Sequence, residues 1–104
     1  MAGSIRVRTA WRDGVTTVRC IIRHPMDTGL SADPETGAVN PPHYIREVVC
    51  SHGDNPVLRC DWSRAVSRNP YLSFAFRGAA TGDLVSISWL DNRGESDTIS
   101  VRIA

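Results

Sequence analysis

The feature that most constrains the fold is an alternation of apolar and polar residues with a period of two, which recurs along the chain. Its clearest example is Tyr71–Arg77, in which Leu72, Phe74 and Phe76 occupy every second position. Successive side chains of a strand point to opposite faces, so this pattern predicts strands with one buried face. Seven such runs are predicted: Ile5–Trp11, Val15 to a stop at His24, Tyr44–Ser51, Val57–Trp62, Tyr71–Arg77, Leu84–Leu90 and Ser96–Ile103.

Turn residues separate most of these runs, and no stretch has a convincing helical period, although Ser63–Asn69 could form a short helical turn. The 104 residues are enough for one core and leave no room for a second. The sequence therefore predicts an all-β fold, with a single domain over residues 1–104. Its expected architecture is an immunoglobulin-like antiparallel β-sandwich of about seven strands.

Alternating strand directions assign each connection to one end of such a sandwich. The long connection from Pro25 to His43, the Ser63–Pro70 segment and the Asp91–Gly94 turn share one end. The turns at Asp13-Gly14, Gly53-Asp54 and Gly78–Gly82 share the other. Long connections inside a compact domain are commonly functional, so we expect binding residues at the end that carries the Pro25 connection.

The stretch after the second strand has its own local chemistry. Pro25 cannot donate a ladder hydrogen bond, and Asp27, Thr28 and Gly29 supply turn residues. Met26 then lies in a loop with no obvious core to fill, where a flexible and polarizable side chain could contact a partner. An ordinary strand-ending turn is the alternative interpretation, because these residue types occur in turns for local reasons alone.

Composition excludes several classes of function. The chain has 41% apolar and 22% charged residues, as an ordinary globular protein does, and its 12 basic residues, all arginine, face 11 acidic ones for a net charge of +1. No basic stripe runs along the sequence, so nucleic acid is not an expected partner. No stretch has the ~20 apolar residues that cross a membrane, and the first residues lack the pattern of a signal peptide.

Three cysteines, Cys20, Cys50 and Cys60, form no Cys-x-x-Cys pair. Cys20 is expected to be a small buried apolar side chain. A turn centred on Gly53 and Asp54 would place Cys50 and Cys60 on opposite faces, and only a longer loop would let them form a disulfide.

Catalytic and metal chemistry have weak signals. Cys50 and His52, two residues apart on one strand, could be a nucleophile and its base, but no third group is marked to orient the histidine. The histidines and carboxylates have no metal-ligand spacing, although loops could still assemble a single-ion site. Trp11, Trp62 and Trp89 are expected in the core or at its edge rather than on a stacking platform. We predict no catalytic residues, no metal and no cofactor.

Four segments carry a more specific signal: Arg23–Gly29, His43–Val48, Ser67–Phe74 and Val85–Gly94. In this order and at this spacing they resemble the SoxZ family, the smaller subunit of the SoxYZ carrier of thiosulfate oxidation. The His-Pro-Met-x-Thr-Gly and Asn-Pro-x-Leu-Ser-Phe blocks are specific together. The resemblance runs from about Ile5 to the end of the chain.

The resemblance implies a non-catalytic subunit that pairs with SoxY, whose C-terminal Gly-Gly-Cys-Gly-Gly arm carries sulfur intermediates between the other Sox enzymes. It also implies a periplasmic protein, exported together with a signal-bearing SoxY. We expect one edge of the partner interface at the loop end, in His24, Pro25, Met26, Asp27, Thr28, Gly29, Asn69, Pro70 and Tyr71. The alternative function is an independent thiol enzyme or sulfurtransferase that uses Cys50 and His52.

Overall fold

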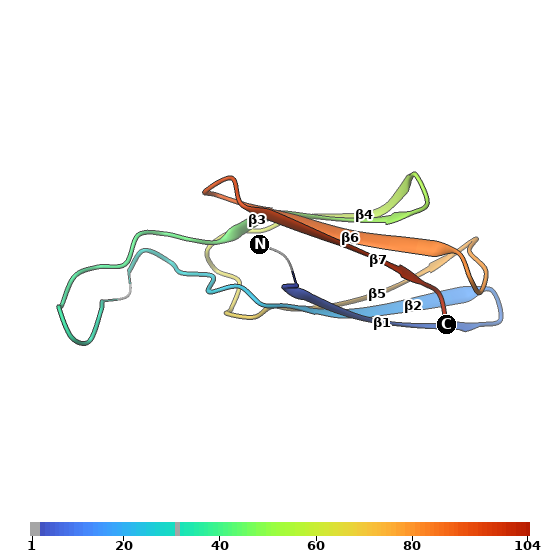
Figure 1. The fold of residues 1–104 in the computed structure, drawn as a ribbon, viewed down its shortest axis with the longest axis horizontal. Coiled ribbons are helices and arrows are strands. Elements are labelled where there is room, and N and C mark those ends of the chain that lie inside the picture. Colours follow the sequence, from blue (N-terminus) through green and yellow to red (C-terminus); the bar gives the residue numbers. More distant parts are fainter. Residues whose placement is uncertain (1–2, 31) are drawn as a thin grey trace.

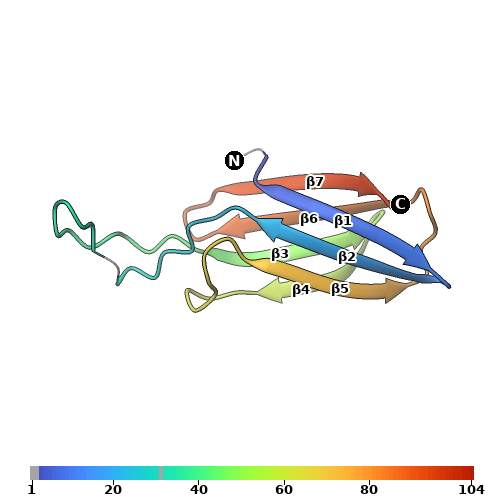
Figure 2. The ribbon, with the colours of Figure 1, turned by 90° about the horizontal axis from the view of Figure 1, so that it is seen from below.

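The computed structural model describes residues 3–30 and 32–104, and it confirms the predicted β-sandwich. Two antiparallel sheets face each other, one ordered β1-β2-β5 and the other β4-β3-β6-β7 (Figures 1 and 2). The described residues contain no helix, and so none that could cross a membrane. The strands are β1 (Ile5–Arg12), β2 (Val15–Ile22), β3 (Ile45–His52), β4 (Asn55–Asp61), β5 (Tyr71–Arg77), β6 (Leu84–Asp91) and β7 (Ser96–Arg102).

The period-two alternation becomes the core as predicted. In β2 the side chains of Val18, Cys20 and Ile22 are buried, and in β6 those of Val85, Ile87 and Trp89. Leu72, Phe74 and Phe76 of β5 are partly buried against them. Each sheet therefore contributes one apolar face, and the space between the sheets is the hydrophobic core.

The three tryptophans differ in burial. Trp89 is buried and its Nε1 donates to Ser4 Oγ at 2.9 Å, while Trp62 is partly buried against the core. Trp11 is exposed near the end of β1, and its Nε1 donates to the carbonyl of Ala79 at 2.9 Å. All three thus follow the expectation of a place in the core or at its edge, since Trp11 lies on β1, an edge strand of its sheet.

The β3–β4 hairpin differs from the sequence prediction in one respect. Its turn is at Gly53 and Asp54, but the register shifts between Cys50 and Ser51, so that Cys50 pairs with Leu58 and Val48 pairs with Cys60. The bulge adds one residue to one strand and moves Cys60 to the face that carries Cys50. The prediction of opposite faces was therefore wrong. The three cysteines are free thiols.

The two ends of the sandwich contain the connections that alternating directions assign to them. Asn69 N–H donates to the His24 carbonyl at one end, and Gly82 N–H donates to the Ile103 carbonyl at the other. Ser63–Asn69 forms turns rather than a helix. The connection between β2 and β3 projects beyond the sandwich as a narrow extension, which we call the arm (residues 27–30 and 32–43; Figure 1).

Candidate functional site at the base of the arm

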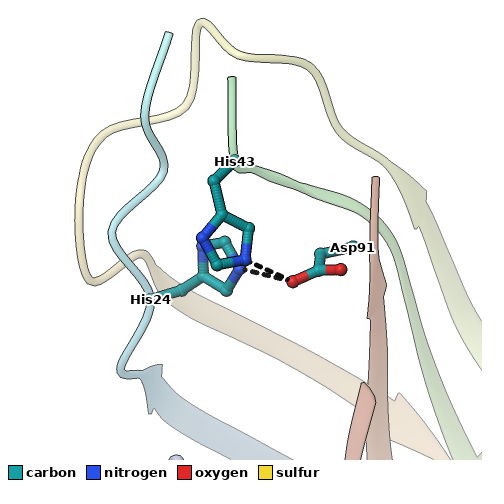
Figure 3. Close-up of side chains that lie close together, drawn as sticks. All are labelled: His24, His43 and Asp91. Carbon is teal, nitrogen blue, oxygen red and sulfur yellow. Dashed lines mark hydrogen bonds and ion pairs between the residues drawn. The ribbon is translucent and has the colours of Figure 1, made fainter. Parts of the chain in front are cut away.

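Three side chains from distant parts of the sequence meet where the arm leaves the sandwich (Figure 3). Asp91 Oδ2 accepts hydrogen bonds from His24 Nε2 at 3.1 Å and from His43 Nε2 at 2.7 Å. His24 follows β2, His43 ends the arm and Asp91 ends β6, so one carboxylate oxygen connects three segments. We call these three residues the His–Asp cluster.

Backbone bonds fix the same region. Asp91 Oδ1 accepts from the N–H groups of Arg93 and Glu95, each at 2.9 Å, which holds the β6–β7 turn. Asp27 and His43 exchange two backbone hydrogen bonds of 2.6 and 3.0 Å across the base of the arm. The side chain of Asp91 is fully buried, and every oxygen of it has partners, as a buried carboxylate requires.

A backbone contact identifies the proton position on His24. The N–H of Met26 donates to His24 Nδ1 at 3.0 Å, so Nδ1 carries no proton. Nε2 of the neutral ring must then carry it and donate to Asp91. The His24 ring also packs edge-on against Trp89, with centroids 5.1 Å apart. His24 is thus a neutral, fully bonded histidine.

The electrostatics agree with this assignment. Burial lowers the pKa of His24 from its usual value, and this outweighs the opposite effect of the hydrogen bond to Asp91. Burial by itself raises the pKa of Asp91, but hydrogen bonds from His24, His43 and the turn backbone exceed it and leave the pKa below normal. At neutral pH the cluster therefore holds an anionic Asp91 beside a neutral His24.

The same three residues are the best candidates for a metal site, because one ligand atom from each lies within 4.8 Å of the others. Coordination through Nε2 of His24 would require its proton to move to Nδ1. That atom already accepts from the Met26 N–H, so a bound ion would break this hydrogen bond. As they stand, the three side chains bond to one another, and the cluster is suited to holding the arm rather than an ion.

Met26 corrects an expectation from the sequence. Its side chain is only 4% exposed and belongs to the core, and its Sδ accepts the N–H of Ile45 at 3.2 Å. Its φ of 46° lies in the left-handed region that non-glycine residues seldom adopt. The premise that Met26 has no core to fill is wrong. A charge placed here would be buried, so Met26→Asp would destabilise the domain itself.

The other residues of the expected interface are placed as follows. The structure buries His24 and Pro70 with Met26, and it half-buries the short turn Asp27, Thr28 and Gly29. Pro25, Asn69 and Tyr71 are exposed. Asn69 supports the cluster from the neighbouring connection, because its Oδ1 accepts the N–H of His24 at 3.1 Å. A partner at this end can therefore contact the exposed residues directly.

Sequence reasoning missed His43 and Asp91. Both follow from the assignment of connections to the ends, since His43 precedes β3 and Asp91 opens the turn after β6, at the end where His24 closes β2. Their contact depends on backbone approaches such as that of Gly29, where a Cβ would lie 3.0 Å from Pro42. Glycine permits both this approach and its φ of 82°.

The proposed thiol pair is not assembled. Cys50 is fully buried, and burial raises the pKa of its thiol to about 12. His52 Nε2 bonds to Asp83 Oδ2 at 2.8 Å instead. Burial also raises the pKa of Cys20 to about 11 and, to a lesser degree, that of Cys60.

Comparison with known proteins identifies the family. A model of the family described as sulphur oxidation protein SoxZ matches residues 5–102. The chain belongs to the SoxZ family. Membership in this family assigns the chain a role in the Sox system of sulfur oxidation. The four sequence segments that resembled SoxZ lie inside the matched range. No curated protein matches the chain by sequence.

Solved structures show the same fold at low identity. The hypothetical protein PH1083 from Pyrococcus horikoshii OT3 is 16% identical with a TM-score of 0.63, over 100% of this chain and 95% of that one. A superoxide reductase in its oxidized state is 15% identical with a TM-score of 0.64, over 96% of this chain and 86% of that one. At this level of identity the two similarities show the architecture only.

Proposed function

We propose that this chain is the non-catalytic subunit of a SoxYZ-type sulfur carrier and that it binds a SoxY-like subunit. The cysteine in the C-terminal segment of that partner would carry covalent sulfur intermediates during thiosulfate oxidation. The observation that carries the proposal is the state of the thiols: a sulfur carrier needs an accessible thiolate, and burial raises the pKa of all three cysteines in a chain of the SoxZ family. This state of the thiols supports a sulfur-carrying cysteine on the partner chain.

The arm supports a binding role. Leu30 is 85% exposed and Val39 is 62% exposed, so the arm presents two of its apolar side chains to solvent. The Asp27–His43 and Ala32–Val39 bridges keep the two halves of the arm together. An ordered extension that presents apolar side chains away from its own core is suited to a partner surface. The exposed Pro25, Asn69 and Tyr71 would continue that interface onto the sandwich.

The alternative, an independent sulfurtransferase using Cys50 and His52, has less support. Cys50 has no access to solvent, and Nε2 of His52 bonds to Asp83 rather than to a thiol. We place the assembled pair in the periplasm, as the family resemblance implies, with export through the partner.

Co-expression with the SoxY-like subunit and size-exclusion chromatography test the proposal. The wild-type chain should elute with the partner as a stable pair. The double variant Leu30→Asp, Val39→Asp should lose at least about tenfold in affinity, since it buries two charges at the interface. Leu84→Asp is the control, because Leu84 is an exposed apolar residue at the opposite end.

The outcomes separate two claims. A wild-type chain that does not pair with the SoxY-like subunit contradicts the proposed function. A wild-type pair that tolerates the arm variant as well as the Leu84 variant shows instead that the arm faces solvent within a correct assembly.

A further inference from the structure

The outer face of the β1-β2-β5 sheet, which is turned toward the viewer in Figure 2, carries a concentration of positive charge. The three strands contain no aspartate or glutamate. Their outward positions include Arg6, Arg8, Arg12, Arg19 and Arg77, all of them exposed. We call these five residues the arginine face. The sequence shows no basic stripe, because the sheet assembles this face from three separate strands.

The register places these charges against one another. Arg8 lies directly opposite Arg19, and Arg6 is in a row with Ile21 and Tyr71. Like charges in directly opposed positions of an antiparallel pair destabilise it. The free chain thus keeps a repulsive pair that a neutral residue would remove.

No carboxylate relieves the repulsion. Among the described residues, the arginine face has one ion pair, between Arg12 and Asp13 at 3.7 Å, and both side chains are more than 90% exposed. The opposite sheet differs: its exposed Arg59 lies near the carboxylates of Glu47 and Asp61, at 3.3 and 3.6 Å. Among the described residues, Arg6, Arg8, Arg19 and Arg77 thus have no carboxylate at ion-pair distance, whereas Arg59 on the opposite sheet has two.

We propose that the arginine face is a docking surface for the acidic face of a second protein, one that visits the carrier complex transiently. This inference rests on the proposed function, because a carrier must meet its enzymes in turn. Guanidinium groups bind carboxylates through paired donors, and exposed charges accelerate association more than they add affinity. Ile21, exposed beside Arg6, supplies apolar contact within the same surface.

Other occupants fit less well. A second copy of the chain would bring arginine against arginine. Nucleic acid usually requires a domain with an isoelectric point above about 9, and this chain has a value near 7.8. A small anion would meet exposed, solvent-screened arginines and bind weakly, whereas an acidic protein surface engages several at once.

Association kinetics of the assembled pair with each purified enzyme of the pathway test the proposal, at low and near-physiological salt. The double variant Arg8→Glu, Arg19→Glu should slow association with at least one enzyme by about tenfold or more at low salt and flatten its salt dependence. The matched control is Arg46→Glu, Arg68→Glu, two exposed arginines outside this face that change the net charge equally. Equal effects of the two variants would overturn the proposal.

A single variant separates binding from folding. Arg8→Glu turns the Arg8–Arg19 repulsion into an attraction, so it should raise the urea midpoint of the free chain while still slowing association. Slower association in a more stable protein cannot come from misfolding. A lower midpoint together with unchanged association would contradict the proposal.

Two further measurements distinguish the occupants. Wild-type affinity for a fluorescent DNA duplex at physiological salt, lost in the double variant, would assign the face to nucleic acid and overturn the proposal. Loss of co-elution between the double variant and the SoxY-like subunit would make this face the permanent interface and would also overturn it. Failure of wild-type pairing would contradict the proposed function, whereas equal association of the two double variants within an intact pair counts against the arginine face alone.

Discussion

Histidine–aspartate contacts lie at both ends of the sandwich, and their distances are similar. At the arm end, His43 Nε2 is 2.7 Å and His24 Nε2 is 3.1 Å from Asp91 Oδ2. At the other end, His52 Nε2 is 2.8 Å from Asp83 Oδ2. The surroundings differ: the Asp91 side chain is fully buried, while those of Asp83 and His52 are 42% and 24% exposed.

Distance alone therefore does not give the energetic weight of such a contact. Removing one partner of a buried pair leaves the other without water or protein to bond, whereas an exposed partner simply returns to water. Asp91 also joins three segments, including the arm, while Asp83 joins the turn before β6 to His52 at the end of β3. The buried cluster should hold the arm in position, and the exposed pair should have little influence beyond its own turn.

The largest effect is expected for Asp91→Asn. The amide keeps an oxygen for the backbone of Arg93 and Glu95 but presents an N–H₂ group to His24, whose Nε2 is already a donor. We expect a loss of about 2–4 kcal/mol in the free energy of unfolding. Urea unfolding followed by tryptophan fluorescence measures it, because Trp89 packs against the His24 ring.

Asp61→Asn is the control for this measurement, since Asp61 is exposed on β4. If Asp91→Asn costs no more than that control, the cluster does not fix the base of the arm.

The contrast between the two ends also shows what the sequence could predict. The strands follow from a local, period-two pattern. The bounds of β5 were therefore predicted to the residue, and those of β1, β6 and β7 to within one or two residues. Which connections lie at the same end of the sandwich follows from strand direction alone. These properties need no knowledge of contacts between distant residues.

The remainder depends on such contacts. Met26 is buried in the core, where its sulfur accepts the N–H of Ile45, a residue distant in the sequence. Cys60 shares a face with Cys50 because of a β-bulge that no residue type in the sequence predicts. Arg8 and Arg19 are far apart in the sequence but adjacent once the β1–β2 register is fixed. Local chemistry at His24–Gly29 correctly indicated that the strand ends there, but it could not show that His43 and Asp91 would join His24.

An intermediate effect is expected from pH. Because the pKa of His24 is lowered in the folded state, the unfolded chain binds a proton below about pH 6.5 that the folded chain does not. Stability should therefore decrease as the pH falls below that value, and decrease again below the normal carboxyl pKa of 3.8, as the lowered pKa of Asp91 is approached. Asp91, His43 and Glu95 are the ionisable groups around His24 that take part in this balance.

Urea midpoints measured between about pH 7 and pH 5 test this sign. His24→Gln removes the titrating ring and should flatten the decrease, whereas His52→Gln leaves the buried ring in place and should retain it. A decrease of equal size in both variants would show that His24 is not its source.

The smallest effect is expected for Asp83→Asn. Hydrogen bonds from His52 and from the N–H of Ala80 lower the pKa of Asp83, so the carboxylate stabilises the fold above the normal pKa of 3.8, and this contribution is lost as the pH falls through the lowered value. Because the side chain is 42% exposed, water can replace the lost partner, and the asparagine oxygen can still accept from Ala80. The urea midpoint should shift by less than that of Asp91→Asn, and the two proteins should converge at acidic pH. If Asp83→Asn instead costs as much as Asp91→Asn at neutral pH, burial is not what separates the two ends, and the number and length of the hydrogen bonds would have to explain their stability.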